Sequence, residues 1–380
     1  MYQLSYWEQA SFFSRIDFLV VGSGIVGLSA ALHLKEQAPK ATVVIVDRGP
    51  LPIGASTRNA GFACFGSVSE LLDDMQHLPE DQVWQIVERR WKGLQRLRQR
   101  LGDQQLQYRA WGGYELFQAD EASNFEQCAE QLPHFNQRLA ELTGRPDTYQ
   151  IASDKIANFG LRGVQHLIWN TAEGQIHTGE MMRGLLEMAR AAGVQQYAGV
   201  TISHIEDQSP QGVQVYTKQS WPIHASKVIV ATNGFARQLL PETEVQPARN
   251  QVLITKPIPH LPIRGCFHYD RGYYYFRNID GRLLLGGGRH LDTEGETTDQ
   301  FGNNPAIRRA LIELLSTVIL PGRTVDIDRW WTGILGLGPT KAPILKTVSP
   351  NVVAAVRLGG MGVAIGSLLG EEAAVLALEG

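Results

Sequence analysis

A glycine-rich turn near the start of the chain, in the sequence DFLVVGSGIVGLSAALHL, constrains the fold most. The apolar run from Phe18 to Val21 predicts a buried strand, and the apolar spacing after the glycines predicts a helix. Gly22, Gly24 and Gly27 form G-x-G-x-x-G between the two. Such glycines permit a tight turn, close approach of the backbone to a pyrophosphate, and packing of helix on strand. The turn therefore predicts a dinucleotide site, with the helix N-terminus facing phosphates.

A second strand pattern, ATVVIVDRG, runs from Thr42 to Val46 and ends at Asp47. A carboxylate at the end of this strand can accept hydrogen bonds from a ribose diol and would repel a 2′-phosphate. The alternative is that Asp47 is a solvated turn residue. The complete strand–helix–strand pattern favours the ribose contact, and it leaves NAD and FAD as the candidate ligands.

The loop GASTRNAGF follows the second strand directly and favours FAD. An FAD protein needs a second contact surface for the ribityl chain and the isoalloxazine ring. The side chains from Ser56 to Asn59 can donate hydrogen bonds to phosphate or to the flavin edge, and Gly54 and Gly61 allow close approach. An ordinary polar loop would have a similar composition.

Length and charge limit the other possibilities. A chain of 380 residues is long enough for two domains, and its 43% hydrophobic content is typical of a globular protein. A formal net charge of −3 provides no reason to expect nucleic acid or an anionic membrane as a partner. The N-terminus shows no basic stretch followed by an apolar run, so we expect no signal peptide. Glu371 and Glu372 interrupt the most apolar stretch, which predicts a buried helix and no stable membrane insertion.

The cysteines Cys64, Cys128 and Cys266 are far apart in the sequence. They show neither a disulfide framework nor metal-ligand spacing, so we expect no metal and a reducing, cytoplasmic compartment. Apolar residues at helical spacing with arginines between them predict an amphipathic helix over 80–102. Its basic residues are interpreted as a solvated face rather than as a site for nucleic acid or lipid.

The order of strand and helix patterns predicts the domain organisation. QYRAWGGYELF is interpreted as a strand pair, residues 121–143 as a helix, and HTGEMMRGLLEMARAAGV as a helix that stops at Gly193. Short strand patterns fill residues 200–234 and 248–290, and a helix is expected near 305–317. We predict an α/β protein: a Rossmann-like FAD-binding domain with an inserted α+β substrate domain on a mostly antiparallel sheet. The FAD-binding domain takes 1–75, 146–240 and 330–380, and the substrate domain takes 76–145 and 241–329.

Taken together, these motifs resemble the FAD-dependent D-amino-acid oxidase, glycine oxidase and sarcosine oxidase superfamily over nearly the whole chain. KVIVATNGFA resembles its late flavin-domain strand, GYYYFRNIDGRLLLGGG its substrate-domain hairpin, and VRLGGMGVAIGSLLGE its C-terminal loop and helix beneath the flavin. The opening LSYWEQA and the sequence STRNAGF are most similar to the γ-glutamylputrescine oxidase branch.

The resemblance implies bound FAD, held non-covalently, with Cys64 as the alternative point of covalent attachment. The motifs and the resemblance together imply these candidate cofactor-binding residues: Gly22, Gly24, Ile25, Val26, Gly27, Asp47, Arg48, Ala55, Ser56, Thr57, Arg58, Asn59, Ala60, Gly61, Val200, Ala231, Thr232, Asn233, Gly234, Gly333, Gly359, Gly360, Met361, Gly362, Val363 and Ala364.

The resemblance also implies oxidation of a C–N bond. An uncharged amine or amino acid gives a hydride to flavin N5, the imine hydrolyses, and oxygen or another acceptor reoxidises the flavin. A flavin dehydrogenase of a 2-hydroxy acid and a non-catalytic flavin-binding subunit are the alternatives. The oligomeric state is not predicted.

The sequence departs from the family at its substrate contacts. Leu335 and Leu358 stand where amino-acid-oxidising relatives carry arginines for the substrate carboxylate, although Arg357 is adjacent. Leu284 stands where sarcosine oxidases use a lysine to activate oxygen, and Lys341 replaces a frequent acidic residue. No catalytic residue is therefore assigned. The candidates for the substrate pocket are Tyr273, Tyr275, Arg277, Arg289, Trp331 and Met361, with Tyr274, Phe276, Arg329 and Trp330 considered beside them.

Overall fold

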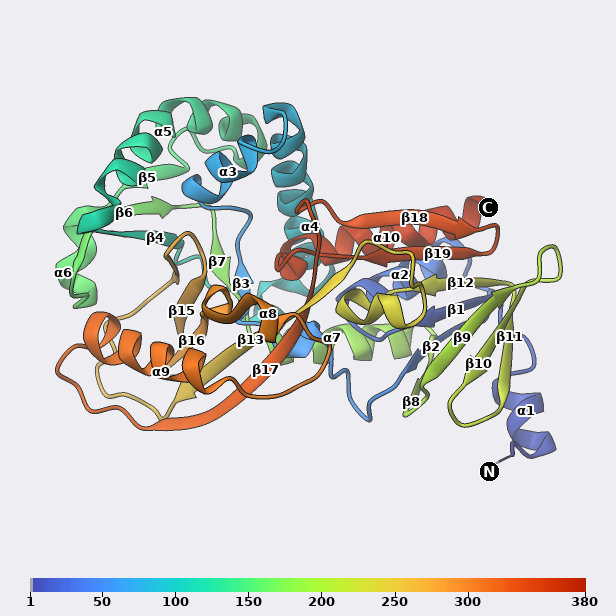
Figure 1. Cartoon of the computed structure of the whole chain (residues 1–380). Coiled ribbons are helices and arrows are strands. Elements are labelled where there is room, and N and C mark those ends of the chain that lie inside the picture. The colour runs from blue at the N-terminus through green and yellow to red at the C-terminus, as the bar shows by residue number, and fades with distance from the viewer. Residues whose placement is uncertain (1–2) are drawn as a thin grey trace.

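Two large β-sheets organise residues 3–380, the part of the chain that the computed structural model describes, and they lie side by side in Figure 1. The first sheet has six strands, all parallel except for the edge strand β18, which is antiparallel to β19. Its order is β18 (Ile344–Ser349), β19 (Val352–Val356), β12 (Lys227–Val230), β1 (Phe18–Val21), β2 (Val43–Asp47) and β8 (Gln195–Ala198).

Both faces of this sheet are covered, which explains the continuous apolar runs in its strands. Val20 of β1 packs into a helical layer, whereas Leu19 and Val21 face the opposite side. The helical layer is made of α2 (Ile25–Gln37), α4 (Glu80–Leu106), α7 (Thr178–Ala191) and α10 (Gly362–Glu379). The opposite face is covered by a three-stranded antiparallel sheet of β9 (Ile202–Asp207), β10 (Val213–Thr217) and β11 (Pro222–Ala225).

Helices α2 and α10 approach each other so closely that only glycine fits at the contact. A Cβ atom added to Gly370 would lie 2.4 Å from the carbonyl oxygen of Val26, and one added to Gly366 would lie 2.6 Å from Cγ2 of Ile25. The first and last helices of the nucleotide unit therefore form one packed pair, which places the start of α10 beside the start of α2.

The second sheet has eight strands and is antiparallel except where β14 runs parallel to β4. Its order is β17 (Ile327–Leu337), β13 (Gln246–Thr255), β16 (Arg282–Gly287), β15 (Tyr274–Ile279), β14 (Cys266–Tyr269), β4 (Gly113–Gln118), β6 (Val164–Asn170) and β5 (Tyr149–Ile151). Its outer face packs against α9 (Pro305–Leu314) through a cluster that includes Phe267, Phe276 and Leu311.

The other elements connect these layers. A two-stranded ribbon of β3 (Phe62–Ala63) and β7 (Gly174–Gln175) lies between the sheets. The remaining helices are α1 (Tyr6–Phe12), α3 (Val68–Met75), α5 (Ala122–Thr143), α6 (Ile156–Phe159) and α8 (Thr293–Glu296). Short turns of helix are η1 (Ala55–Thr57), η2 (Ala119–Glu121), η3 (Ser153–Lys155), η4 (Asn233–Gln238), η5 (Arg289–Asp292) and η6 (Leu315–Ile319). Among the described residues, no helix is both long enough and apolar enough to span a membrane.

The predicted fold class is confirmed: a parallel nucleotide-binding sheet is joined to a mostly antiparallel second sheet. Two details differ from the sequence-based expectation. QYRAWGGYELF forms one strand, β4, because Arg109 makes only an isolated bridge to Gln175. Strands β5 and β6 join the eight-stranded sheet although 146–240 is assigned to the FAD-binding domain, because the free edge of β4 needs a partner.

Two further segments lie across the predicted boundaries. Helix α4 falls in the predicted substrate domain, yet Leu94, Leu97 and Leu106 of its second half pack in the helical layer of the nucleotide unit. The apolar residues of its first half pack in a separate cluster with α3 and α5. Strand β17 begins before the predicted boundary at residue 330 and belongs to the eight-stranded sheet. The division into domains itself stays a prediction.

The contact between α2 and α10 predicts the effect of one substitution. We expect Gly370→Val to lower the free energy of unfolding by about 3 kcal/mol, because the added carbons must displace the backbone of α2. Urea unfolding followed by circular dichroism measures this. Val375→Leu, on the exposed side of the same helix, is the control and should change stability by less than about 0.5 kcal/mol. Equal stability of the two variants would contradict the prediction.

Candidate functional site

A pocket opens at the carboxyl ends of the parallel strands, as expected for an open α/β sheet. Val21 at the end of β1, Asp47 at the end of β2 and Ala231 after β12 line it. Its empty space, including the part open to solvent, is about 1250 Å³. The wall is built from the ends of three parallel strands, from the loop 52–56 and from the starts of α2 and α10.

The glycine turn forms one wall of the pocket because two of its residues cannot carry side chains. Gly22 has a φ of +109°, and a Cβ atom there would lie 2.9 Å from the carbonyl oxygen of Ala231. A Cβ atom on Gly27 would lie 1.9 Å from the carbonyl oxygen of Gly22. Helix α2 therefore starts directly against the turn, and the backbone N–H groups of its first turn face the pocket without intrahelical partners.

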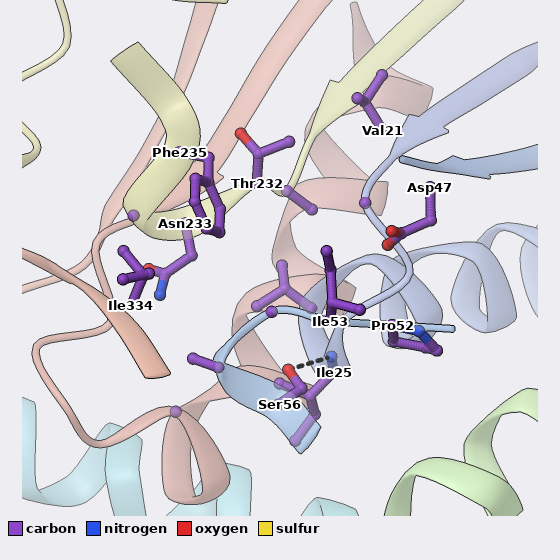
Figure 2. A pocket seen from close by; sticks show the side chains of 18 of the residues that line it. Val21, Ile25, Asp47, Pro52, Ile53, Ser56, Thr232, Asn233, Phe235 and Ile334 are labelled. Atoms are coloured by element: carbon purple, nitrogen blue, oxygen red, sulfur yellow. Dashed lines mark hydrogen bonds between the residues drawn. The ribbon is translucent and has the colours of Figure 1, made fainter. Parts of the chain in front are cut away.

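Asp47 holds the turn as well as lining the pocket (Figure 2). Its Oδ2 atom accepts hydrogen bonds from the backbone nitrogen of Ser23 at 2.9 Å and from Ser23 Oγ at 2.7 Å. Its Oδ1 atom accepts from the backbone nitrogen of Gly49 at 3.0 Å. A carboxylate can accept about four hydrogen bonds, so acceptor capacity remains for a ribose hydroxyl.

The polar residues of the loop 54–62 serve mainly to shape the loop itself. Ser56 Oγ accepts from the backbone nitrogen of Ile25 at 3.0 Å, which fastens the loop to the start of α2 (Figure 2). Asn59 Nδ2 donates to the carbonyl oxygens of Ala55 and Ser56, and its Oδ1 accepts from the backbone nitrogen of Gly61 at 2.7 Å. Ser56 and Asn59 still line the pocket. The loop is thus a rigid wall with two polar side chains at the pocket surface.

Arg58, another donor from this loop, turns away from the pocket. Its Nη1 atom donates to the carbonyl oxygen of Thr332 at 3.0 Å, and its guanidinium carbon lies 4.5 Å from the ring centre of Phe301. The neighbouring Thr57 donates to the carbonyl oxygen of Gly54. Arg58 therefore ties the loop to β17 of the second sheet, and its predicted contact with the cofactor stays a prediction.

Arg48 and Asn233 complete the pocket from two other segments. The guanidinium carbon of Arg48 lies 3.7 Å from the ring centre of Phe235, and burial lowers the pKa of Arg48 although Asp47 opposes that shift. Asn233 Oδ1 accepts from the backbone nitrogens of Arg357 and Leu358, at 3.1 and 3.2 Å. This side chain thereby joins the segment after β12 to the loop before α10.

Seventeen of the predicted cofactor-binding residues line the pocket: Gly22, Gly24, Ile25, Val26, Asp47, Arg48, Ala55, Ser56, Asn59, Val200, Ala231, Thr232, Asn233, Gly234, Gly360, Gly362 and Val363. Nine do not: Gly27, Thr57, Arg58, Ala60, Gly61, Gly333, Gly359, Met361 and Ala364. Several of these have packing roles instead, since Gly333 lies against Arg58 and the carbonyl of Ala364 lies against Gly93 of α4.

Sequence reasoning missed the apolar part of the wall, which includes Pro52, Ile53, Met181, Phe235, Ile334 and Leu335. Phe235 directly follows the predicted Gly234, and Ile53 precedes the predicted loop, so extending each motif by one or two residues would have found them. Met181 and Ile334 come from α7 and β17 and carry no local signal.

The pocket fits FAD on two observations. Thr232 Oγ1 is buried beside the pocket and has no hydrogen-bond partner. Cβ atoms added at Gly54 and Gly360 would meet nothing within 4 Å, so open space lies over the backbone at both positions. A polar, elongated ligand would give Thr232 Oγ1 a hydrogen-bond partner and would fill the open space over Gly54 and Gly360.

An aromatic and aliphatic cluster lies beside the pocket, on the face of the eight-stranded sheet opposite α9. Ala60, Val252 and Leu284 form its buried centre, and Tyr275 and Trp331 pack against it. Trp331 Nε1 donates to the carbonyl oxygen of Arg58 at 3.0 Å, and the ring centres of Phe62 and Tyr275 lie 5.8 Å apart. This cluster, with Phe62, Ile254 and Ile279 at its edge, is called the apolar face below.

The structure separates the substrate-pocket candidates. Tyr275 and Trp331 meet on the apolar face, whereas Trp330 packs on the opposite face of the sheet. Tyr273 precedes β15, is 42% exposed, and its ring centre lies 4.4 Å from that of His290 with the two rings tilted. Tyr274 and Phe276 belong to the outer core, Arg289 lies in η5, and Met361 caps α10.

The arginines considered as carboxylate anchors mostly have other partners. Arg329 lies on the surface near Asp328, and Arg357 donates to the carbonyl oxygens of Ala342 and Glu244 inside the protein. Arg277 is 2% exposed and approaches the carbonyl oxygen of Gly61 at 3.5 Å, while its Nε atom is buried without a partner.

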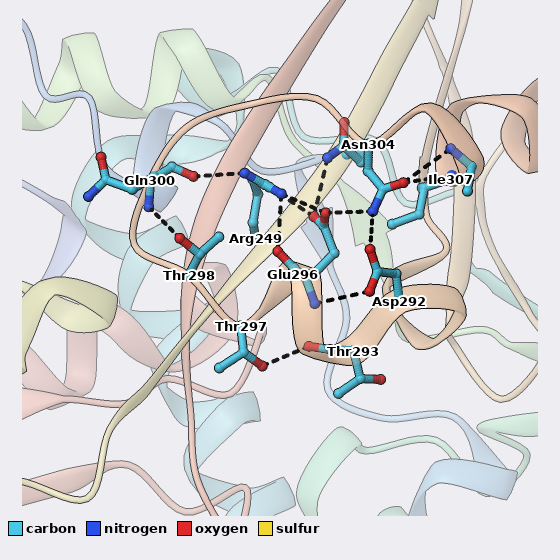
Figure 3. A network of polar contacts seen from close by, with 12 residues as sticks. Arg249, Asp292, Thr293, Glu296, Thr297, Thr298, Gln300, Asn304 and Ile307 are labelled. Atoms are coloured by element: carbon cyan, nitrogen blue, oxygen red, sulfur yellow. Dashed lines mark hydrogen bonds and ion pairs between the residues drawn. The ribbon is translucent and has the colours of Figure 1, made fainter.

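Arg249, on β13, is fully engaged in the polar network of Figure 3. Its Nε and Nη2 atoms donate to the two carboxylate oxygens of Glu296, at 3.0 and 2.8 Å. Burial opposes ionisation of Glu296, but hydrogen bonds from Arg249, Asn304 and Gln251 hold its pKa below the usual value. The pair fastens α8 to β13 and leaves Arg249 without a free edge for a ligand.

Comparisons with known proteins agree with this geometry. Residues 17–376 match the family described as FAD dependent oxidoreductase. The chain is 27% identical over 387 residues to "Probable oxidoreductase OrdL" of Rhizobium meliloti, covering 96% of this chain and 83% of that protein. It is 25% identical over 376 residues to gamma-glutamylputrescine oxidoreductase of Escherichia coli, covering 95% and 83%. The glycine oxidase structure from Geobacillus kaustophilus has a TM-score of 0.75 at 19% identity, covering 96% and 95%, which supports the fold.

The contacts of Asp47 predict its effect on cofactor binding. We expect Asp47→Asn to weaken binding of FAD about tenfold or more, because an acceptor oxygen facing Ser23 and the ribose becomes a donor. Titration of the apoprotein with FAD, followed by quenching of flavin fluorescence, measures the dissociation constant. Asp17→Asn is the matched control, since Asp17 also accepts from a backbone nitrogen, that of Thr42, on the exposed surface. Unchanged affinity in Asp47→Asn would rule out the ribose contact.

Proposed function

The chain belongs to the family of FAD-dependent oxidoreductases, and from this premise we propose that it oxidises a C–N bond of an amine or amino acid. FAD supplies a two-electron acceptor that takes a hydride from the substrate carbon. The substrate imine is then hydrolysed to a carbonyl compound and an amine or ammonia. Oxygen or another acceptor would take up the two electrons.

The position of the apolar face next to the pocket is the observation that carries this proposal. Strand β17 runs from one to the other: Trp331 lies on the apolar face, and Ile334 and Leu335 line the pocket. A substrate lying against Trp331 and Tyr275 would therefore be next to a molecule bound in the pocket. We propose that these two side chains orient the substrate and exclude water.

The amine must be uncharged when it loses a hydride, and the apolar face favours that form. A cationic amine would lose hydration against Ala60, Val252 and Leu284, which offer no compensating charge. Burial raises the pKa of Tyr275 to about 12, so its hydroxyl stays protonated at neutral pH and can donate a hydrogen bond to an amine nitrogen. We propose this hydroxyl as a positioning group.

Two further features of this chain support proposals about its cellular location and its electron acceptor. The described cysteines are all free and buried, as in a reducing compartment, and we propose a cytoplasmic enzyme. Leu284 lies on the apolar face where a lysine would serve oxygen activation. We therefore propose that reoxidation of the flavin does not use a lysine at this position.

Anaerobic reduction of the bound flavin tests the proposed reaction. We expect an amine, an N-methyl amino acid or a D-amino acid to bleach the flavin absorbance, and 2-hydroxy acids to leave it unchanged. Reoxidation on admission of air would identify an oxidase, and its absence a dehydrogenase. Bleaching only by hydroxy acids, or bound flavin that no compound reduces, would overturn the proposal and favour a hydroxy-acid dehydrogenase or a non-catalytic subunit.

The two adjacent tryptophans provide a matched test of the substrate surface. We expect Trp331→Phe to lower kcat/KM about tenfold, equivalent to about 1.4 kcal/mol, while FAD stays bound. Trp330→Phe, on the opposite face of β17, should change kcat/KM less than about twofold. Steady-state kinetics with the reducing substrate measures both. Equal effects in the two variants would show that the apolar face does not contact the substrate.

A further inference from the structure

A buried group of metal-ligand types lies between the two sheets, outside the nucleotide pocket. Ligand atoms of Cys64, Glu173 and His268 all lie within 4.8 Å of one another, and Cys64 and Glu173 are each only 2% exposed. The three residues come from distant parts of the sequence. Cys64 follows β3, Glu173 precedes β7, and His268 lies on β14 of the eight-stranded sheet.

Backbone pairing holds two of these residues in place. β3 and β7 are antiparallel, with Ala63 opposite Gly174, so Cys64 and Glu173 follow and precede paired residues. Glu173 Oε1 accepts hydrogen bonds from the backbone nitrogens of Phe65 and Gly66, at 2.8 and 3.2 Å. The carboxylate is therefore fixed by the same turn of chain that carries Cys64.

His268 supplies an independent observation that the group is incomplete. Its Nε2 atom is buried and has no hydrogen-bond partner among the described residues. Burial lowers the pKa of His268, although the charge of Glu70 opposes that shift. In a neutral imidazole one ring nitrogen carries a free lone pair. A buried nitrogen without a partner costs free energy unless a ligand satisfies it.

A second thiol and a buried cation complete the surroundings. Cys266 Sγ lies 3.2 Å from the carbonyl oxygen of Gly174 and hydrogen-bonds to Cys64. Arg277 pairs with Cys266 across β14 and β15. Its guanidinium is almost fully buried and forms no ion pair with a carboxylate within the described residues, although Cys64 and Cys266 are close enough to interact with its charge. Negative charge on the thiols would compensate this cation.

We propose that Cys64, Glu173, His268 and Cys266 form a binding site for a divalent cation of the zinc type. Two thiolates, an imidazole and a carboxylate are the donor set that Zn²⁺ takes in tetrahedral sites. The charges of two thiolates and one carboxylate would be balanced by Zn²⁺ together with Arg277. On binding, each thiol loses its proton to solvent as its sulfur–metal bond forms.

The alternative is a hydrogen-bonded cluster of protonated thiols. Cys64 can donate to Glu173 and Cys266 to Gly174 in that arrangement, but His268 Nε2 stays unsatisfied. Bonds of about 2.0–2.3 Å to zinc place tetrahedral ligand atoms roughly 3.3–3.8 Å apart. The ligand atoms of Cys64, Glu173 and His268, already within 4.8 Å of one another, would need to move inward by about 1 Å or less, which side-chain rotations can provide. Cys266 does not belong to that group of three, and its Sγ atom, which contacts Cys64, would turn inward by a larger rotation to become the fourth ligand.

The site would act as a clamp. Cys64 comes two residues after Phe62, at the end of the loop that forms the pocket wall, while His268 and Cys266 belong to the second sheet. One ion would therefore fix the end of that loop to the eight-stranded sheet. Zn²⁺ has no redox chemistry of its own, so this inference is independent of the proposed oxidation.

Metal content of the flavin-loaded protein tests the site directly. The protein is stripped with EDTA under reducing conditions, incubated with zinc chloride, freed of excess metal by gel filtration and analysed by mass spectrometry for zinc. We expect about one zinc ion per wild-type chain. Cys64→Ser and His268→Ala should retain less than about a tenth of it. Cys128→Ser is the matched control, because Cys128 is a free, buried cysteine in α5 that contacts Asn124, and it should bind zinc as the wild type does.

The flavin spectrum and circular dichroism establish that each variant is folded. Wild-type protein that takes up no more zinc than folded Cys64→Ser would overturn the proposal, and so would equal loss in Cys128→Ser. If both ligand variants fail to fold, wild-type protein loaded with cadmium decides the question. A cadmium–thiolate absorption band in the ultraviolet is expected, and its absence would also overturn the proposal.

Discussion

The close approach of α2 to both the glycine turn and α10 is the constraint on which the rest of the structure depends. Gly27 brings the helix against Gly22, and Gly366 and Gly370 bring α10 against the other side of α2. Helices α2 and α10, from opposite ends of the sequence, are therefore packed together by their own backbones. Both helices start at the pocket. The pocket wall therefore contains segments that lie more than 300 residues apart in the sequence.

The eight-stranded sheet depends on this arrangement because one of its faces must be covered by the nucleotide unit. Successive side chains along its strands point to opposite faces of this sheet. Phe267 and Phe276 face α9, whereas His268, Tyr275 and Arg277 face the other way. The inward face then has two parts with different chemistry. Near β13 and β17 it is apolar, beside the pocket; near β14 and β4 it carries buried thiols, carboxyl groups and a guanidinium.

The loop 54–62 joins these regions, and its polar residues serve the joining. Ser56 fastens it to α2, Arg58 fastens it to β17, and Asn59 holds its own turn closed. The glycines and polar side chains in this loop thus serve one purpose, a rigid wall close to a ligand. A rigid wall orders the ligand at lower entropic cost than a mobile loop would.

The sequence by itself determined the fold class, the family, the glycine turn with Asp47, and the strands β1, β2 and β12 whose ends meet at the pocket. These features are local: glycine spacing, apolar runs and turn residues act over a few neighbouring positions, so they are visible without the third dimension. Only the tertiary structure decided which polar side chains of the loop turn inward, that β5 and β6 pair with β4, and that Met181 and Ile334 reach the pocket. It alone brought Cys64, Glu173 and His268 together. These outcomes depend on strand register and on contacts between residues far apart in the chain, and such contacts leave no pattern in the neighbouring sequence.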